Sequence, residues 1–109
     1  DESADCRVSG QIVDGQTGRG LEGVMVAALK PGIAVKQYAE GRDRKLIHSL
    51  AVTGGDGRFT FPEQLPKGQT YGLVVLADGY QDLGIDSALS IGAHVPEQAT
   101  MNPIPLTRG

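Results

Sequence analysis

The side chains best suited to catalysis in this sequence are one cysteine and two histidines, and they lie far apart along the chain. A nucleophilic cysteine needs a histidine or a helix N-terminus close by, and a general base must lie within hydrogen-bond reach of its partner. Cys6 stands near the N-terminus, His48 begins a predicted strand and His94 falls in a predicted turn. We therefore expect two surface histidines, a passive thiol and no catalytic residue.

Cys6 is the sole cysteine, so it cannot form a disulfide within the chain. Pairing with another chain and attachment of a lipid are the two alternatives to a passive thiol.

Metal binding has little support in the sequence. Zinc needs three or four ligands, which one cysteine and two scattered histidines do not supply. Calcium needs several oxygen ligands, and the spacing of the candidate aspartates matches no calcium-loop motif. These candidates are Asp56, Asp78, Asp82 and Asp86. Turn formation already explains them, so we predict no metal and no cofactor.

The charge and hydropathy of the chain argue against two classes of partner. The 109 residues carry a formal net charge of −3, whereas nucleic-acid binding needs a concentrated basic surface. No apolar run reaches the roughly 18 residues that span a bilayer, so we predict no transmembrane segment in this chain. Arg42, Arg44 and Lys45 form the one basic cluster.

The elements that must position these groups are predicted to be strands, organised around residues 52–80. Apolar side chains alternate there, and a two-residue period is typical of a half-buried strand. The alternating set is Leu50, Val52, Phe59, Phe61, Tyr71, Leu73, Val75 and Ala77. The Gly-Gly-Asp-Gly sequence at 54–57 predicts a tight turn, because glycine adopts positive φ at little cost.

Further strands are predicted over 7–13, 21–29, 83–91 and 99–107, and one short helix near 34–41. The 21–29 strand is apolar on both faces, which indicates a position in the middle of the layers. Pro103 and Pro105 lack amide protons on the same side of their strand, which therefore forms a sheet edge. The pattern predicts an all-β fold, a seven-stranded antiparallel Greek-key sandwich. We expect 1–6 to be a flexible segment and 7–109 to form a single domain.

Two stretches match an ordered series of short motifs, VSGQIVDGQTGRGLEGVMVAAL at 8–29 and VTGGDGRFTFPEQLPKGQTYGLVVLADGY at 52–80. The series is Gly-x-Val-x-Asp, a Thr-Gly turn, Leu-x-Gly-Val-x-Val, Thr-x-x-Asp-Gly-x-Phe and a closing Gly-Tyr. In these motifs the chain resembles the carboxypeptidase regulatory-like domains, a branch of the transthyretin-like (prealbumin-like) sandwiches. The matching residues are Gly10, Ile12 in place of valine, Asp14, Thr17, Gly18, Leu21, Gly23, Val24, Val26, Thr53, Asp56, Gly57, Phe59, Gly79 and Tyr80.

The resemblance implies a non-catalytic accessory domain of a secreted or cell-envelope protein, often joined to peptidases, transporters or receptors. We therefore expect an extracytoplasmic location: periplasmic, cell-surface or secreted. The motif positions have a structural explanation, since Asp14 and Asp56 are able to accept hydrogen bonds from the amides of their own turns. The residues predicted to shape turns are Asp14, Gly18, Asp56, Gly57, Gly79 and Tyr80.

An enzymatic alternative comes from the transthyretin-like hydroxyisourate hydrolases, which use histidines, an arginine and a C-terminal Tyr-Arg-Gly-Ser. Arg58 matches the arginine position, and Arg108 followed by glycine resembles the ending. Leu106 and Thr107 stand where the tyrosine is expected, and 7–13 contains no histidine. We therefore predict that the protein is not an enzyme.

Two binding hypotheses remain. The first is docking to a protein partner, or to the rest of a parent protein, through the 30–47 segment, with Tyr38, Arg42, Arg44 and Lys45 as recognition residues; Tyr38 is alternatively a core residue. The second is a polysaccharide-binding module, which needs exposed aromatic faces. Only Tyr38 and Tyr80 qualify for that role, and we expect Tyr80 to be packed.

Overall fold

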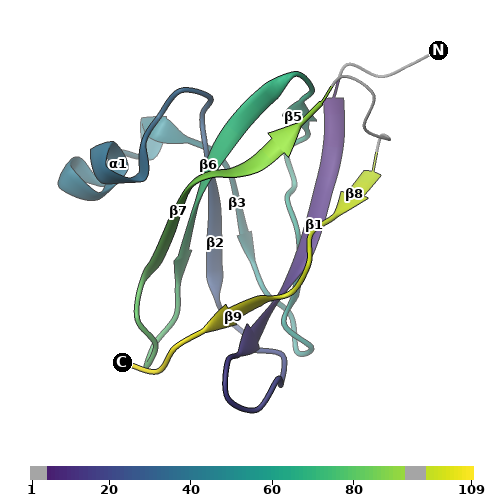
Figure 1. Ribbon diagram of the computed structural model, residues 1–109, viewed down its shortest axis with the longest axis vertical. Coiled ribbons are helices and arrows are strands. Elements are labelled where there is room, and N and C mark those ends of the chain that lie inside the picture. The colour runs from purple at the N-terminus through teal and green to yellow at the C-terminus, as the bar shows by residue number, and fades with distance from the viewer. Residues whose placement is uncertain (1–4, 93–97) are drawn as a thin grey trace.

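The computed structural model describes residues 5–92 and 98–109 and confirms a β-sandwich of two sheets with one short helix (Figure 1). The first sheet has five strands arranged around β1. Its strands are β1 (Asp5–Asp14), β4 (Arg58–Thr60), β5 (Leu65–Pro66), β8 (Gln98–Thr100) and β9 (Ile104–Leu106). β1 begins at Asp5, so Cys6 belongs to the sheet.

The β1 strand is the centre of the five-stranded sheet. Ser9 pairs with Thr60 of β4 and also with Thr100 of β8, so these two strands flank β1 on opposite sides. β4 and β5 run antiparallel to β1, whereas β8 and β9 run parallel to it. The prediction of antiparallel pairing throughout is therefore wrong for this sheet, because the chain returns to the start of β1 before β8 begins.

The second sheet has four antiparallel strands in the order β3-β2-β6-β7. Their bounds are β2 (Met25–Leu29), β3 (Ile47–Val52), β6 (Gln69–Leu76) and β7 (Leu83–Ile91). β2 lies between β3 and β6, and its side chains pack on both faces of the sheet. The central position predicted from its two apolar faces is confirmed. The strand starts at Met25 rather than at residue 21, because residues 21–24 form a turn with its flanking residues.

The described residues form nine strands where seven were predicted. β5 has two residues, too few to produce a recognisable alternation. The 99–107 segment is divided into β8 and β9 by residues 101–103. In the described part of the chain β9 pairs with β1 alone, which confirms the edge position expected from Pro103 and Pro105.

The main core lies between the two sheets and follows the predicted alternation. Along β1 the even-numbered side chains are buried, including Cys6, Val8 and Ile12, while the odd-numbered ones are half-buried or exposed. Phe59 and Phe61 meet edge to face, with ring centroids 5.3 Å apart. Strand alternation therefore accounts for the principal packing of this sheet.

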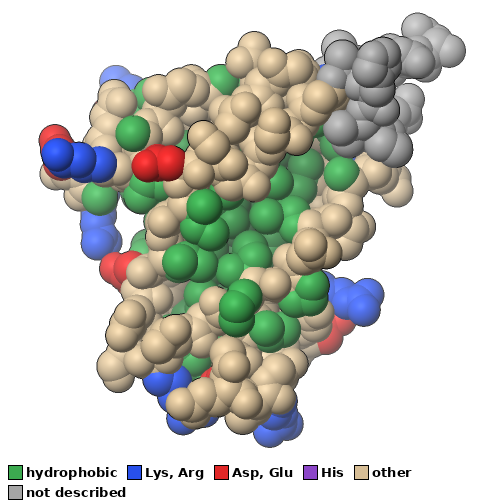
Figure 2. Space-filling view, viewed as in Figure 1, with side chains coloured by type: hydrophobic (Ala, Val, Ile, Leu, Met, Phe, Trp, Pro, Cys, Tyr) green, Lys and Arg blue, Asp and Glu red, His purple; other side chains and the backbone are tan. Residues whose placement is uncertain are grey.

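At one side of the sandwich the edges of the two sheets do not meet, and apolar side chains are visible between them (Figure 2). Figure 2 shows apolar side chains gathered in the middle of the face between β7 and the β8–β9 edge. Neither edge offers a regular ladder to a further strand, because β7 carries Ser87 at φ 55° and β9 contains Pro105.

Side chains alternate along β3, but the buried face is the one opposite to that predicted. Val52 pairs with Met25 and Ala51 with Val26, whose side chain lies in the core between the sheets. Partners in an antiparallel register share a face, so Ala51 points inward and Val52 points outward. Val52 is 62% exposed, and its prediction as a half-buried residue of the alternating set is wrong. Leu50 shares this outer face and packs against the apolar cluster around Tyr38, whereas Val52, at the end of the strand, is exposed.

The predicted helix near 34–41 is confirmed as α1 (Val35–Gly41), followed by a 3-10 turn, η1 (Arg44–Leu46). The helix α1 lies close to the sheet because Gly84 has no side chain. A Cβ at this position would lie 2.3 Å from the Val35 side chain. Tyr38 anchors the helix in a second apolar cluster with Ala27, Leu29 and Val74. The outer face of the four-stranded sheet is thus partly covered by this segment.

Cys6 gives a direct test of the packing. Its side chain is fully buried, and burial raises the pKa of the Cys6 thiol, which disfavours the reactive thiolate. We expect a thiol reagent such as Ellman's reagent to react with Cys6 more slowly in the native protein than in denaturant, by a factor of roughly 100 or more. Equal rates in native and denatured protein would contradict the burial of β1.

Candidate functional site

The most connected polar cluster joins Asp14, Tyr80 and Arg108 at one end of the sandwich. The Asp14 side chain is 3% exposed. One carboxylate oxygen of Asp14 accepts bonds from the amides of Gln16 at 2.7 Å and Thr17 at 3.1 Å. The other accepts a bond from the Tyr80 hydroxyl at 2.6 Å and one from Nε of Arg108 at 3.2 Å.

These contacts determine the ionisation of the cluster. The Tyr80 hydroxyl, followed by the two turn amides, holds the pKa of Asp14 well below its usual range. The same hydrogen bond raises the pKa of Tyr80. The guanidinium of Arg108 also lies over the Tyr80 ring, 5.9 Å from its centroid. Each oxygen of the carboxylate accepts two hydrogen bonds, and together they link the end of β1 to two distant segments. We therefore assign Asp14 a structural role.

The remaining predicted turn residues also lie in turns. Gly18, Gly57 and Gly79 have φ values of 77°, 80° and 81°, a region that disfavours other residues. The Asp56 carboxylate accepts a bond from the Arg58 amide at 3.0 Å, and it forms an exposed ion pair with the Arg58 guanidinium at 3.5 Å. Arg58 and Arg108 therefore take part in separate networks, each with its own aspartate.

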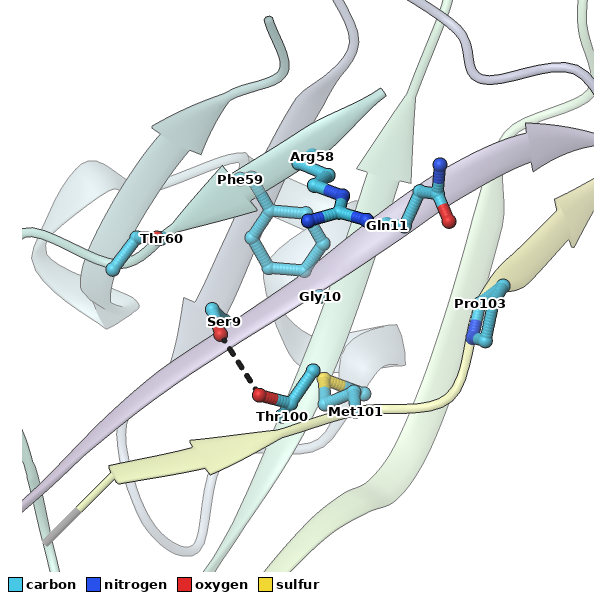
Figure 3. A pocket seen from close by; sticks show the side chains of 9 residues that line it. All are labelled: Ser9, Gly10, Gln11, Arg58, Phe59, Thr60, Thr100, Met101 and Pro103. Atoms are coloured by element: carbon cyan, nitrogen blue, oxygen red, sulfur yellow. Dashed lines mark hydrogen bonds between the residues drawn. The ribbon is translucent and has the colours of Figure 1, made fainter. Parts of the chain in front are cut away.

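A shallow pocket of about 360 Å³, lined by both polar and apolar groups, lies on the five-stranded sheet (Figure 3). Hydroxyl, amide and guanidinium groups come from the strands β1, β4 and β8. These groups belong to Ser9, Gln11, Arg58, Thr60 and Thr100, with Gly10, Phe59, Met101 and Pro103 completing the lining. The Ser9 and Thr100 hydroxyls lie 3.4 Å apart. We call this pocket the polar face; it offers hydrogen bonds and one cation.

The 30–47 segment, which we call the basic arm, is closed at its base by a bond from the Lys30 amide to the Leu46 carbonyl of 2.8 Å. Its five basic residues are exposed: Lys30, Lys36, Arg42, Arg44 and Lys45. With two acidic residues the arm carries a net charge of +3, so the rest of the chain carries −6. The arm thus concentrates positive charge on an otherwise acidic chain.

Two aspartates near β7 fix the helix of the basic arm. The Asp86 carboxylate accepts a bond from the Val35 amide at 2.7 Å, and Asp82 lies 4.0 Å from Arg42. Sequence analysis missed both roles, because each contact joins positions at least 40 residues apart without a shared motif. Tyr38, predicted as a recognition residue or a core residue, is 7% exposed and packs in the core. Arg42, Arg44 and Lys45 are the accessible members of that set.

A small apolar cavity of about 90 Å³ lies beneath α1, and we call it the apolar socket. The lining residues are Val35, Tyr38, Ala39, Arg42, Val74, Leu76, Asp82, Leu83 and Gly84. Arg42 and Asp82 supply its charged groups, and aliphatic side chains supply most of the remaining lining.

Of the two histidines, His48 lies in the part of the chain that the structure describes. The His48 ring bonds to the Gln64 carbonyl at 2.9 Å and lies near Tyr71. His94 lies outside the described residues, so its predicted surface position is not described. Within the same described ranges, no three side chains of the ligating types lie close enough to hold a metal ion. No described helix is long and apolar enough to cross a bilayer.

Comparison with known proteins supports the architecture. No protein-family model and no curated protein matches this chain. A crystal structure of hydroxyquinol 1,2-dioxygenase from Pseudomonas putida DLL-E4 is similar over 100% of this chain and 58% of its own, with TM-score 0.60 and 12% identity. A 9R-lipoxygenase from Cyanothece PCC8801 is similar over 96% of this chain and 17% of its own, with TM-score 0.53 and 13% identity. This chain therefore resembles the β-sandwich portions of larger proteins, and the likeness extends to the fold alone.

Proposed function

We propose that this protein is a non-catalytic, extracytoplasmic accessory module of the carboxypeptidase regulatory-like kind, which docks an acidic protein surface through its basic arm. The observation that carries the proposal is the charge distribution, +3 on the arm and −6 on the remainder. A concentrated patch of one sign steers a partner of opposite sign and orients it. The extracytoplasmic location and the family rest on the sequence motifs described above.

The backbone at Arg42 supports a functional role for this side chain. Arg42 is the C-cap of α1 and has φ 48° and ψ 41°, the left-handed conformation in which glycine is favoured. Its amide donates a bond of 2.6 Å to the Tyr38 carbonyl. An arginine at this position costs about 1 kcal/mol relative to glycine. Retaining it there keeps a guanidinium at the rim of the apolar socket.

Charge reversal tests the docking surface. We expect the triple variant Arg42→Glu, Arg44→Glu, Lys45→Glu to bind a blocked, glutamate-rich peptide with a central alanine roughly 10- to 100-fold more weakly than the wild type at low salt. Isothermal titration calorimetry measures the affinity, and circular dichroism verifies that the fold is intact.

The matched control reverses three charges outside the arm, Arg7→Glu, Arg19→Glu and Lys67→Glu. It produces the same change in net charge and should lower the affinity for the peptide by less than roughly threefold, because charges distant from the binding surface are screened. An equal loss in both triple variants would contradict a localised docking surface. Arg42→Gly should weaken binding while preserving or raising the denaturation midpoint.

Polysaccharide binding is the second candidate, and the polar face is the observation that favours it. Its hydroxyl, amide and guanidinium groups suit a hydroxylated ligand. The aromatic residues supply little stacking surface, since four of the five are buried and the Arg108 guanidinium lies over the Tyr80 ring. A calorimetric glycan screen tests this candidate; saturable heat that disappears in Gln11→Ala and Arg58→Ala would favour it over docking.

A further inference from the structure

We propose that the apolar socket beneath α1 receives one aliphatic side chain from the acidic segment that the basic arm binds. This inference rests on the proposed function and specifies the partner: an acidic peptide segment with a central leucine, isoleucine or valine. The basic arm supplies the attraction for the acidic residues, and the socket supplies a defined position for the aliphatic one.

The first argument is the chemistry of the socket wall. Val35 and Ala39 come from the helix, Val74 and Leu76 from β6, and Leu83 from β7. This half-open pocket of about 90 Å³ is lined mostly by apolar surface, and transfer of an aliphatic side chain from water to such a surface is favourable. The charged lining groups, Arg42 and Asp82, are directed toward each other at 4.0 Å and have side chains 66% exposed. An aliphatic side chain therefore suits this cavity better than water does.

The second argument is the position of the socket. Arg42 belongs to both the basic arm and the socket lining, so the charged surface adjoins the cavity. Glutamates on either side of the aliphatic residue would meet Arg42 at the socket and the exposed residues Arg44 and Lys45 farther along the arm. The two features are therefore continuous, and charge complementarity selects an acidic segment.

The third argument distinguishes a peptide from an anionic membrane. The part of the chain outside the arm carries −6, which opposes approach to an extended anionic surface. A short peptide segment meets less of this repulsion because it covers only the arm and the adjoining socket, where Asp82 is the one acidic lining residue. The socket also accommodates a single side chain rather than a layer of lipid chains.

The test compares two blocked glutamate-rich peptides that differ at the central residue, one with leucine and one with alanine. We expect the leucine peptide to bind the wild-type protein roughly 10- to 100-fold more tightly, which corresponds to burial of one leucine side chain. Ala39→Leu places a larger side chain at an exposed helix position that lines the socket. This variant should bind the leucine peptide no more tightly than the alanine peptide, and its affinity for the alanine peptide should equal that of the wild type.

Gln37→Leu is the matched control, since Gln37 is an exposed residue of α1 that does not line the socket. It should retain the preference for the leucine peptide. Equal affinity of the wild type for both peptides would contradict binding of an aliphatic side chain in the socket. In that case, weaker peptide binding after charge reversal of the arm would still support docking. Failure of both peptides to bind, together with binding to phosphatidylserine vesicles, overturns the docking function and the socket alike.

Discussion

Gly57→Ala is expected to destabilise the protein by about 3 kcal/mol or more. Gly57 has φ 80°, and a Cβ there would lie 2.3 Å from the Ile12 carbonyl oxygen and 2.7 Å from the Leu21 amide nitrogen. Both obstructing atoms belong to backbone, which is held by the bond of 2.9 Å from the Leu21 amide to the Ile12 carbonyl. The chain cannot relieve the clash by a side-chain rotation. Urea denaturation monitored by circular dichroism measures the loss.

Gly18→Ala is the matched control for this prediction. Gly18 has φ 77°, but a Cβ at this position would have no heavy atom within 4 Å. The control therefore introduces the same backbone strain without the clash and should cost about 1 kcal/mol. An equal cost for the two substitutions would show that the 57 turn does not pack closely against β1.

Asp14→Ala should lower the thermal midpoint by roughly 10 °C or more, because a buried carboxylate linking three segments is removed. The substitution leaves the Gln16 and Thr17 amides and the Tyr80 hydroxyl without their acceptor. Differential scanning calorimetry measures the change. Asp56→Ala is the control, because Asp56 also accepts a turn amide but its side chain is 63% exposed. A similar fall in both variants would contradict the special role of the Asp14 cluster.

The same carboxylate predicts a pH dependence with a defined sign. The pKa of Asp14 is lowered in the folded protein, so its contribution to stability is present above the pKa of the unfolded state, about 3.9. This contribution decreases as pH falls below about 4 and continues to decrease toward the lowered folded-state pKa. The difference in unfolding free energy between wild type and Asp14→Asn should therefore shrink on acidification. A difference that stays constant between neutral pH and about pH 2 would contradict this account.

Local patterns were sufficient to predict much of the architecture. Alternation over 52–80 predicted the buried positions of Phe59, Phe61 and Leu73, and two apolar faces predicted the central place of β2. The turn-forming roles of Asp14 and Asp56 depend on amides two or three residues away, a distance that sequence reasoning handles well.

Contacts between residues distant in the sequence could not be predicted from local patterns. Arg108 reaches Asp14 across 94 positions, and Asp86 reaches the Val35 amide across 51. Neither pair has a local motif, because a carboxylate accepts from any suitably placed donor. The outward orientation of Val52 likewise depends on its register with Met25, which alternation alone does not specify. The same limit applies to the apolar socket, which exists only where α1 rests on β6 and β7.

The most direct test of the central claim is a nuclear magnetic resonance titration of the labelled protein with the leucine-centred acidic peptide. We predict saturable amide shifts confined to the basic arm and to the neighbouring residues of the socket, including Val74 and Leu83. The resonances of Ser9, Gln11 and Thr100 on the polar face should stay unchanged. Shifts centred on the polar face, or no saturable shift in the basic arm, would contradict the claim that the arm is the docking surface.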